Sequence, residues 1–361
     1  MMAGKPPSRP ARGRGATGNT EGRFAKTTRL AEHDDWADDD PGPPDPRTTV
    51  SEERARSVIS RNRSPDLPFD RSVNAYRGCE HGCSYCFARP SHAYLDLSPG
   101  LDFETRLFAK TNVAEVLRSE LAKPGYACAP IAMGTNTDPY QPIERRYRLT
   151  RAIIEVLADC GHPFTLLTKN ALVERDLDLL EPLARRKLVS VALSVTTLDN
   201  RLSAKLEPRA SAPHRRLQAI RRLSEAGIPT GVMFAPVIPA VNDHEMEAVL
   251  AAAREAGATR AGYVLLRLPH ELKDLARDWL QAHYPERAAH VMSLVRQGRG
   301  GRDYDARFGQ RQAGTGAWAA LVGARFKLAW RKLGYSEWRA VPLDTEKFVR
   351  PRAPSPQGQL F

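Results

Sequence analysis

The sequence predicts an α/β fold in which a parallel sheet is curled into a partial (βα)6 barrel, similar to a TIM barrel. Three observations lead to this prediction. Six strand-like apolar segments alternate with helix-like segments over about 200 residues. Residues 188–195 are apolar enough to be buried on both faces, as strands of parallel sheets are. Polar residues follow several of the apolar segments, at the end of a barrel where active sites lie.

The strand candidates are short apolar runs, and the segments between them have helical periodicity. Strands are expected at residues 72–76, 129–134, 163–169, 188–195, 230–235 and 261–266. Helices are expected at residues 113–122, 146–160, 172–186, 213–226 and 244–256. Gly161 and Gly227 follow two of these helices, in the position where helices commonly end.

The two ends of the chain differ from this alternating core. Residues 1–65 are dominated by Pro, Gly, Arg and Asp and predict a disordered leader before a core at residues 66–270. Helical patterns at 271–283, 288–296 and 318–333 predict a helical C-terminal extension over residues 271–345, interrupted by a Gly-rich basic segment at 296–302. Residues 346–361 are Pro-rich and predict a flexible tail.

The extension interleaves basic and aromatic side chains, which leaves two interpretations open. The side chains concerned are Arg307, Arg311, Arg325, Lys327, Arg331 and Lys332 among Phe308, Trp318, Phe326, Trp330, Tyr335 and Trp338. Such a pattern can bind phosphates and stack bases. It is also typical of an amphipathic helix that packs its aromatic side chains on a barrel.

Composition narrows the class of partner and the compartment. The formal net charge of +12 favours association with a polyanion, of which nucleic acid is the commonest soluble one, although genomic bias towards Arg contributes to it. No apolar run is long enough to span a bilayer, and the basic start lacks the apolar core of a secretory signal. Five cysteines clustered three and two do not resemble a disulfide framework. We therefore expect a cytoplasmic protein with no membrane partner.

Three of the five cysteines lie within eight residues, as Cys79, Cys83 and Cys86. This Cys-x3-Cys-x2-Cys spacing on a Gly-rich loop allows three thiolates to bind one metal centre. A fourth cysteine is missing nearby. A closed zinc site requires four ligands, with His81 or His92 as candidates for the fourth, whereas a [4Fe-4S] cluster held by three thiolates leaves one iron open.

The Cys-x3-Cys-x2-Cys motif, with Tyr85 before the third cysteine and after the first strand of a (βα)6 pattern, resembles that of the radical S-adenosylmethionine (SAM) superfamily. The resemblance covers residues 67–270. It implies a [4Fe-4S] cluster on the three cysteines, with SAM chelated to the open iron and cleaved to a 5'-deoxyadenosyl radical. It also implies that Tyr85 packs against the cluster or the adenine.

Within that superfamily the chain looks most like the branch of spore photoproduct lyase and DNA repair photolyase-like proteins. The match rests on residues 134–138 (Gly-Thr-Asn-Thr-Asp), Thr168-Lys169, Ser194 and residues 206–209 (Leu-Glu-Pro-Arg). It implies SAM contacts by Asn136, Asp138, Lys169, Ser194, Glu207 and Arg209. Physical chemistry suits these roles, since Lys169 can balance the SAM carboxylate and Asp138 its ammonium, while Asn136 or Ser194 can bind ribose or carboxylate oxygens.

One departure from that branch concerns the substrate. In spore photoproduct lyase a cysteine at the end of the second strand returns hydrogen to the product, and the aligned residue here is Gly134. Cys128 and Cys160 are not obviously placed to replace it, and buried inert thiols are common. The sequence therefore does not predict spore photoproduct repair.

The last five residues suggest a partner. Gln357, Leu360 and Phe361 end the chain in a Gln-x-x-Leu-Phe pattern that resembles the peptide with which bacterial repair proteins bind the DNA sliding clamp. The leading hypothesis is a radical SAM enzyme that acts on nucleic acid by DNA lesion chemistry, reduced by a flavodoxin or ferredoxin. The alternatives are a radical SAM enzyme acting on RNA, a peptide or a small molecule, and a non-catalytic zinc or iron–sulfur module that binds nucleic acid.

Overall fold

The computed structural model describes residues 11–25, 47–337 and 342–352 of the chain. Within these residues a seven-stranded sheet has the order β10-β9-β8-β7-β6-β3-β2. Its strands are β2 Ile59–Arg61, β3 Arg71–Val73, β6 Ile131–Met133, β7 Phe164–Thr168, β8 Val189–Ser194, β9 Thr230–Val237 and β10 Arg260–Leu265. Neighbours from β3 to β10 are parallel, and β2 is antiparallel to β3. Because β10 and β2 form the two edges, the sheet stays open, and the predicted partial barrel is confirmed.

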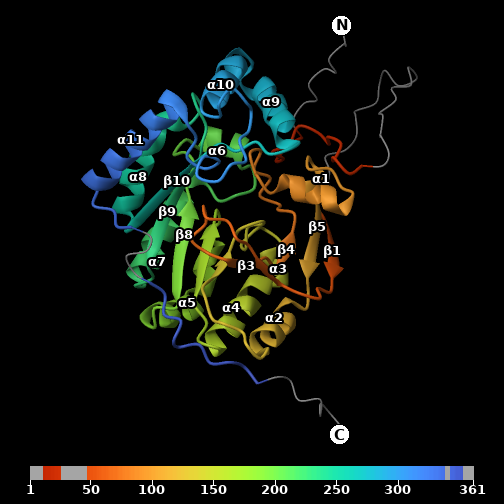
Figure 1. The fold of residues 1–361 in the computed structure, drawn as a ribbon, viewed down its shortest axis with the longest axis vertical. Coiled ribbons are helices and arrows are strands. Elements are labelled where there is room, and N and C mark those ends of the chain that lie inside the picture. The colour runs from red at the N-terminus through yellow and green to blue at the C-terminus, as the bar shows by residue number, and fades with distance from the viewer. Residues whose placement is uncertain (1–10, 26–46, 338–341, 353–361) are drawn as a thin grey trace.

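Helices cover the outer face of this sheet (Figure 1). They are α2 Val113–Ala122, α3 Glu144–Tyr147, α4 Leu149–Asp159, α5 Leu177–Arg185, α7 Pro213–Glu225 and α8 Met246–Glu255, with the short helix η2 Ala171–Asp176 before α5. In α7 the buried side chains Arg216, Ala219, Ile220 and Leu223 recur at helical spacing, so one stripe of the helix faces the sheet. The predicted helix at 146–160 starts at Leu149 because Arg148 has a left-handed backbone, with φ of +52°.

A second, three-stranded sheet was absent from the sequence prediction. It has the order β1-β5-β4, with β1 Thr49–Glu53, β5 Arg106–Lys110 and β4 Tyr76–Arg77, and it lies beside the helix α1 Asp102–Thr105 (Figure 1). The strand β1 is polar and largely exposed, and it is held by backbone pairing with β5 rather than by an apolar face. Apolar periodicity therefore could not reveal it.

The prediction of a disordered leader over residues 1–65 is wrong for its described parts. Residues 47–65 supply β1 and β2. Residues 11–25, which we call the N-terminal strap, lie against the loop that carries the cysteines: the backbone N–H groups of Gly15 and Ala16 donate to the Glu104 carboxylate at 3.0 and 2.7 Å. Further along, Arg23 forms an ion pair of 3.0 Å with Glu271. Backbone groups bound by buried carboxylates, rather than apolar side chains, hold this segment.

The C-terminal extension consists of α9 Leu272–His283, α10 Pro285–Gln297 and α11 Gly316–Lys332. The aromatic side chains of the last helix mostly pack inward: Phe326 lies 4.7 Å from the ring of Tyr263, and the buried Tyr335 hydroxyl donates to the Leu250 carbonyl at 2.6 Å. The packing interpretation of the aromatic pattern therefore holds for these residues, while Trp338 lies outside the described part.

Residues 342–352 cross the end of the barrel opposite to α6, α9 and α10 (Figure 1). Phe348 packs against Tyr126 and His162, with ring centroids 5.5 and 5.2 Å apart, and the Val349 N–H donates to the Cys160 carbonyl at 2.8 Å. The packed chain thus extends past residue 346, where the flexible tail was predicted to begin. The predicted clamp-binding residues lie outside the described residues. None of the described helices is long and apolar enough to cross a membrane.

Candidate functional site

Residues 78–89, which we call the cysteine loop, follow β4 at the end of the barrel where α6 Asn200–Leu206 lies. Gly78 has a φ of +74°, and a Cβ built on it would lie 2.8 Å from the Phe103 carbonyl oxygen, so only glycine fits here. The Cys79 N–H donates to the same carbonyl at 2.9 Å. Cys79 and Cys83 are buried and Cys86 is half-buried, and all three are free thiols.

A buried ion pair braces this loop from behind. The Arg89 guanidinium, which is 0% exposed, lies 2.6 Å from Glu104 and donates to the carbonyls of Cys83 at 2.8 Å and Gly100 at 2.7 Å. Glu104 is equally buried and accepts the two N–H groups of the N-terminal strap. One carboxylate therefore connects the cysteine loop, α1 and the strap.

The two histidines suggested as a fourth zinc ligand contact backbone and carboxylate groups of the protein. Among the described residues no three His, Cys, Asp or Glu side chains converge on the position of a single metal ion. His92 Nε2 lies 3.0 Å from the Arg106 carbonyl, and His81 Nδ1 lies 3.3 Å from Asp138, so both candidate fourth ligands are engaged elsewhere. Each thiolate of an iron–sulfur cube binds a different iron, so a cluster does not require such convergence.

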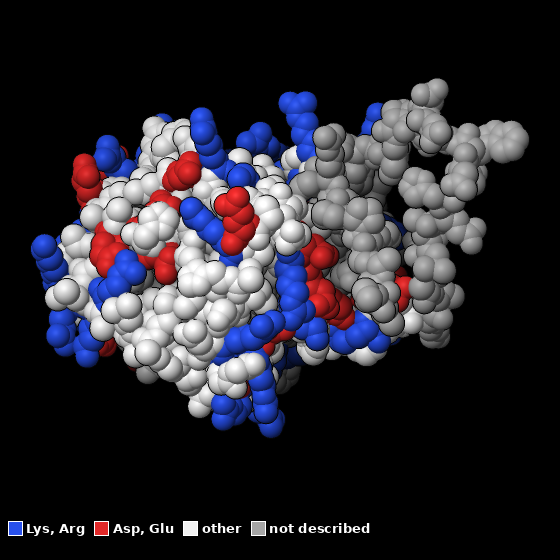
Figure 2. Space-filling view, turned by 90° about the horizontal axis from the view of Figure 1, so that it is seen from above, with Lys and Arg blue, Asp and Glu red and all other residues white. Residues whose placement is uncertain are grey.

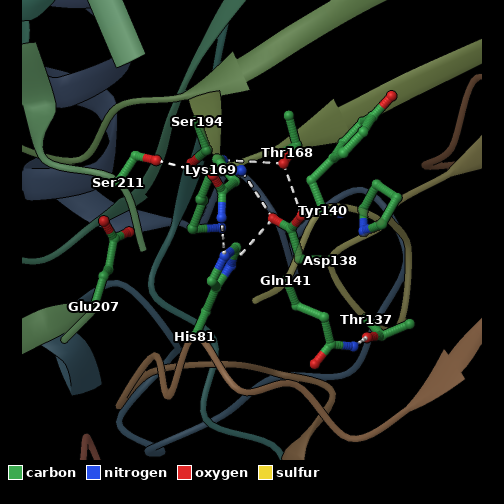
Figure 3. Close-up of polar contacts among 12 residues, drawn as sticks. His81, Thr137, Asp138, Tyr140, Gln141, Thr168, Lys169, Ser194, Glu207 and Ser211 are labelled. Carbon is green, nitrogen blue, oxygen red and sulfur yellow. Dashed lines mark hydrogen bonds and ion pairs between the residues drawn. The ribbon is translucent and has the colours of Figure 1, made fainter. Parts of the chain in front are cut away.

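Asp138 is the centre of a buried network at the ends of β6 and β7 (Figure 3). Its carboxylate accepts hydrogen bonds from Thr168 Oγ1 at 2.7 Å and from the Lys169 N–H at 2.8 Å. The Tyr140 N–H at 2.8 Å and the His81 imidazole complete its surroundings. Burial alone would raise the pKa of Asp138, but the nearby His81 and the hydrogen bond from Thr168 lower it to about 2. These groups contact both oxygens of the Asp138 carboxylate.

Asn170 extends this hydrogen-bond network to the other nitrogen of His81. Asn170 Oδ1 accepts hydrogen bonds from Leu172 N–H and the Ser211 hydroxyl, both at 3.0 Å. The Asn170 amide nitrogen therefore faces His81 Nε2, 3.2 Å away. Burial alone would lower the pKa of His81, but the neighbouring Asp138 carboxylate raises it to about 9.

Lys169 is half-buried beside the cysteine loop, and its Nζ lies 5.9 Å from the centroid of the Tyr85 ring. Burial lowers the pKa of Lys169, but the neighbouring Cys83 and Glu207 outweigh this and raise it above the ordinary value. The ammonium is therefore charged. Within the described part of the chain, its Nζ makes none of the hydrogen bonds or ion pairs that engage the other buried charges. It is a charged group at the mouth of the barrel, with Glu207 as an electrostatic neighbour.

Glu207 connects the loop after α6 to the cysteine loop. It accepts a hydrogen bond from the Tyr85 hydroxyl and forms a fully buried ion pair with Arg216 of α7. Burial alone would raise the pKa of Glu207, but Arg216 and Lys169 lower it, so the carboxylate is charged. Arg216 also donates to the Ser194 carbonyl at 2.9 Å. Glu207 therefore positions Tyr85 within this network.

The other predicted residues lie at the same end of the barrel. The Ser194 hydroxyl donates to the Ala235 carbonyl at 3.1 Å, and Arg209 forms an ion pair of 2.8 Å with Glu80. Among the described residues, the side-chain amide of Asn136 makes only a long contact of 3.4 Å with the Ser91 hydroxyl.

Comparison with known proteins identifies the family. The model of the radical SAM superfamily matches residues 73–253. The chain belongs to the radical SAM superfamily. An uncharacterised protein of Mycobacterium tuberculosis is 43% identical over 234 residues, which is 64% of this chain and 69% of that protein. A radical SAM Nalpha-GlyT isomerase of Pseudomonas phage M6 is 26% identical over 167 residues, or 46% of this chain and 33% of that protein.

Solved radical SAM structures share the fold. Spore photoproduct lyase complexed with dinucleoside spore photoproduct superposes with a TM-score of 0.56 over 80% of this chain and 81% of that chain, at 14% sequence identity. At this identity the likeness concerns the fold. The superfamily implies a SAM-dependent enzyme with an iron–sulfur cluster.

Sequence reasoning missed several residues that organise this site. They are Arg89, Glu104, Asn170 and Arg216. Arg216 left a detectable signal, since it occupies a position on the apolar stripe of α7 where an unpaired arginine would be costly. The others interact with residues distant in sequence and carried no local signal.

Proposed function

We propose that this protein binds a [4Fe-4S] cluster at Cys79, Cys83 and Cys86 and cleaves SAM reductively, in order to act on nucleic acid. The observation that carries the proposal is the charged Lys169 ammonium, which makes no hydrogen bond or ion pair within the described residues, beside three free thiols on one braced loop. Three thiolates leave one iron of a cube open, and the amino and carboxylate groups of SAM can chelate it. When bound and reduced, such a cluster would supply the one electron needed to cleave SAM to methionine and a 5'-deoxyadenosyl radical.

The residues present fit this group. Burial raises the pKa of Cys83 and Cys86, so the metal-free thiols are protonated and release their protons on binding iron. Lys169 supplies the positive charge that a bound SAM carboxylate requires. The only contact of the Asn136 amide within the described residues is long, so this amide can turn to a ribose or carboxylate oxygen.

The remaining predicted residues act through others. Asp138 holds Lys169 and His81 in place, since its oxygens accept from the Lys169 backbone and face the imidazole. Glu207 holds Tyr85, whose ring then borders the space in front of the thiols. Ser194 and Arg209 fix the loops after β8 and α6. We assign these groups as positioning residues and keep direct SAM binding for Lys169 and Asn136.

Nucleic acid is the substrate class that we favour. The net charge of +12 attracts polyanions, and a fold neighbour has been solved with a dinucleoside lesion. The reaction itself differs from that of the lyase in one respect. Gly134 has a φ of +90°, and a Cβ built there would lie 2.0 Å from the Leu167 carbonyl oxygen. A cysteine cannot occupy this position without moving the backbone, so position 134 offers no thiol as a hydrogen donor.

The proposal is tested by anaerobic reconstitution with iron and sulfide in the presence of a flavodoxin or dithionite as the reductant. We expect about four irons per chain and, after reduction, an electron paramagnetic resonance spectrum that changes when SAM is added. Lys169→Met should keep the iron and lose the response to SAM, while the exposed Lys327→Met serves as the matched control. A chain that binds one zinc ion and no iron–sulfur cluster would overturn the proposal.

A further inference from the structure

Residues 298–315, the connector between α10 and α11, join the two edges of the open barrel. On the β10 side, Leu265 N–H donates to the Gln312 carbonyl at 2.9 Å, and Arg299 donates to the Leu266 carbonyl at 2.8 Å. On the β2–β3 side, Arg311 binds the Asp66 carboxylate at 2.7 Å, and the Gly309 N–H donates to it at 2.6 Å. The connector therefore borders the side opening of the barrel at the end where the cysteine loop lies.

Aromatic rings are exposed along this border, and each is paired with an arginine. Phe87 directly follows Cys86 and is 47% exposed, with the Arg267 guanidinium 5.0 Å from its ring centroid. Phe308 of the connector is 57% exposed, with Arg311 at 4.7 Å. We call Phe87, Arg267, Tyr304 and Phe308 the aromatic rim. Arg267 connects its parts, because Arg267 also lies 3.4 Å from the Tyr304 hydroxyl.

The charge of the rim is only partly balanced. Arg311 is held by Asp66, so its role is structural. Arg267 forms no ion pair within the described residues, and its buried Nε has no hydrogen-bond partner there. Figure 2, seen from above Figure 1, shows Lys and Arg around a largely uncharged area with Asp and Glu among them, so overall charge does not define an interface on this face. The distinguishing feature is the combination of exposed rings with a guanidinium beside the cysteine loop that forms no ion pair within the described residues.

We propose that the aromatic rim binds single-stranded nucleic acid, with an unpaired base stacked on Phe87 and a phosphate held by Arg267. This inference rests on the proposed function and specifies its substrate as an unpaired segment. Rings that expose about half of their surface offer a face to any base, and stacking on aromatics combined with arginine contacts is the general mode of single-strand binding. An apolar protein partner would instead require a contiguous apolar patch, whereas these rings are separate and each lies beside a guanidinium.

The test measures the affinity of the anaerobically reconstituted protein for a fluorescent oligodeoxythymidylate. The affinity for an abasic strand of the same length is measured separately for comparison. Phe87→Ala should weaken binding of the thymidylate by about tenfold and leave binding of the abasic strand unchanged, because only the thymidylate has bases that can stack. Arg267→Gln should weaken binding of both strands and reduce the slope of log affinity against log salt concentration by about 0.7. Because Phe87 adjoins a cysteine, Phe308→Ala serves as a second stacking variant and the exposed Leu328→Ala as the control.

The inference would be overturned if Phe87→Ala and Phe308→Ala lost affinity equally for the two strands, or if neither variant lost affinity. It would also be overturned if the wild-type protein did not bind the thymidylate. Strand binding needs neither a reductant nor SAM cleavage, so the proposed enzyme and the proposed strand-binding rim can fail independently. Cleavage of SAM without strand binding would refute only the role of the aromatic rim. Strand binding without an iron–sulfur cluster would refute the proposed enzyme.

Discussion

Replacing Glu104 by alanine removes the one carboxylate that connects Arg89 to the N-terminal strap. Arg89 and Glu104 are both fully buried, and their side chains lie 2.6 Å apart. The variant leaves a buried guanidinium without its counter-charge, which typically costs about 3–5 kcal/mol. It also leaves the N–H groups of Gly15 and Ala16 without an acceptor, at about 1 kcal/mol or more each. Against a total stability of about 5–15 kcal/mol, we expect a large loss.

The assay is urea denaturation followed by circular dichroism, with iron content after reconstitution as a second measurement. Glu181→Ala is the matched control, because Glu181 forms an exposed pair with Arg185 at 2.9 Å and its loss should cost about 0–1 kcal/mol. The double variant Arg89→Met/Glu104→Leu should recover part of the stability, since no buried charge remains. If Glu104→Ala lost no more free energy of unfolding than Glu181→Ala, the claim that Glu104 stabilises this region would be refuted. Normal iron binding in the destabilised variant would show that the brace does not support the cysteine loop.

Three further predictions concern separate parts of the molecule. Gly134→Ala should lower the free energy of unfolding by about 1–3 kcal/mol more than Gly125→Ala, which shares a positive φ but meets no atom within 4 Å; equal losses would contradict the steric argument. Burial lowers the pKa of His162 to about 4, so the unfolded chain binds the proton more readily and stability should fall by up to about 3 kcal/mol as the pH drops from 6.5 to 4. The drop should shrink in His162→Gln, and an unchanged pH profile in that variant would exclude this cause. Leu360→Ala/Phe361→Ala should weaken binding of the full chain to the bacterial sliding clamp by at least about tenfold in surface plasmon resonance. Equal binding by this variant and the wild type would refute the prediction that the C-terminal peptide binds the clamp.

The barrel could be predicted from sequence because its signals are local. The helix expected at residues 113–122 coincides with α2, since its buried residues Val113, Leu117 and Leu121 recur at helical spacing. The cysteine spacing is likewise contained in a few residues. In contrast, the strand β1 and the N-terminal strap are held by backbone hydrogen bonds to distant groups, which leave no apolar pattern.

The sequence predicts which strand ends meet, but not the contacts that the side chains make there. Strand ends bring Asp138 and Lys169 together, as expected for a parallel sheet. The contacts of Asp138 with Thr168 and His81 join residues that are 30 or more positions apart in the sequence. Residue type and spacing do not encode such contacts.

The central claim is tested most directly by the amount of 5'-deoxyadenosine formed when the reconstituted protein is given SAM and dithionite under anaerobic conditions. Cys83→Ala should form none, because one of the three thiolates is lost. Cys128→Ala should match the wild type, since this half-buried thiol lies outside the cysteine loop. Formation of 5'-deoxyadenosine by Cys83→Ala at the wild-type rate, or none by the wild-type protein, would contradict the account.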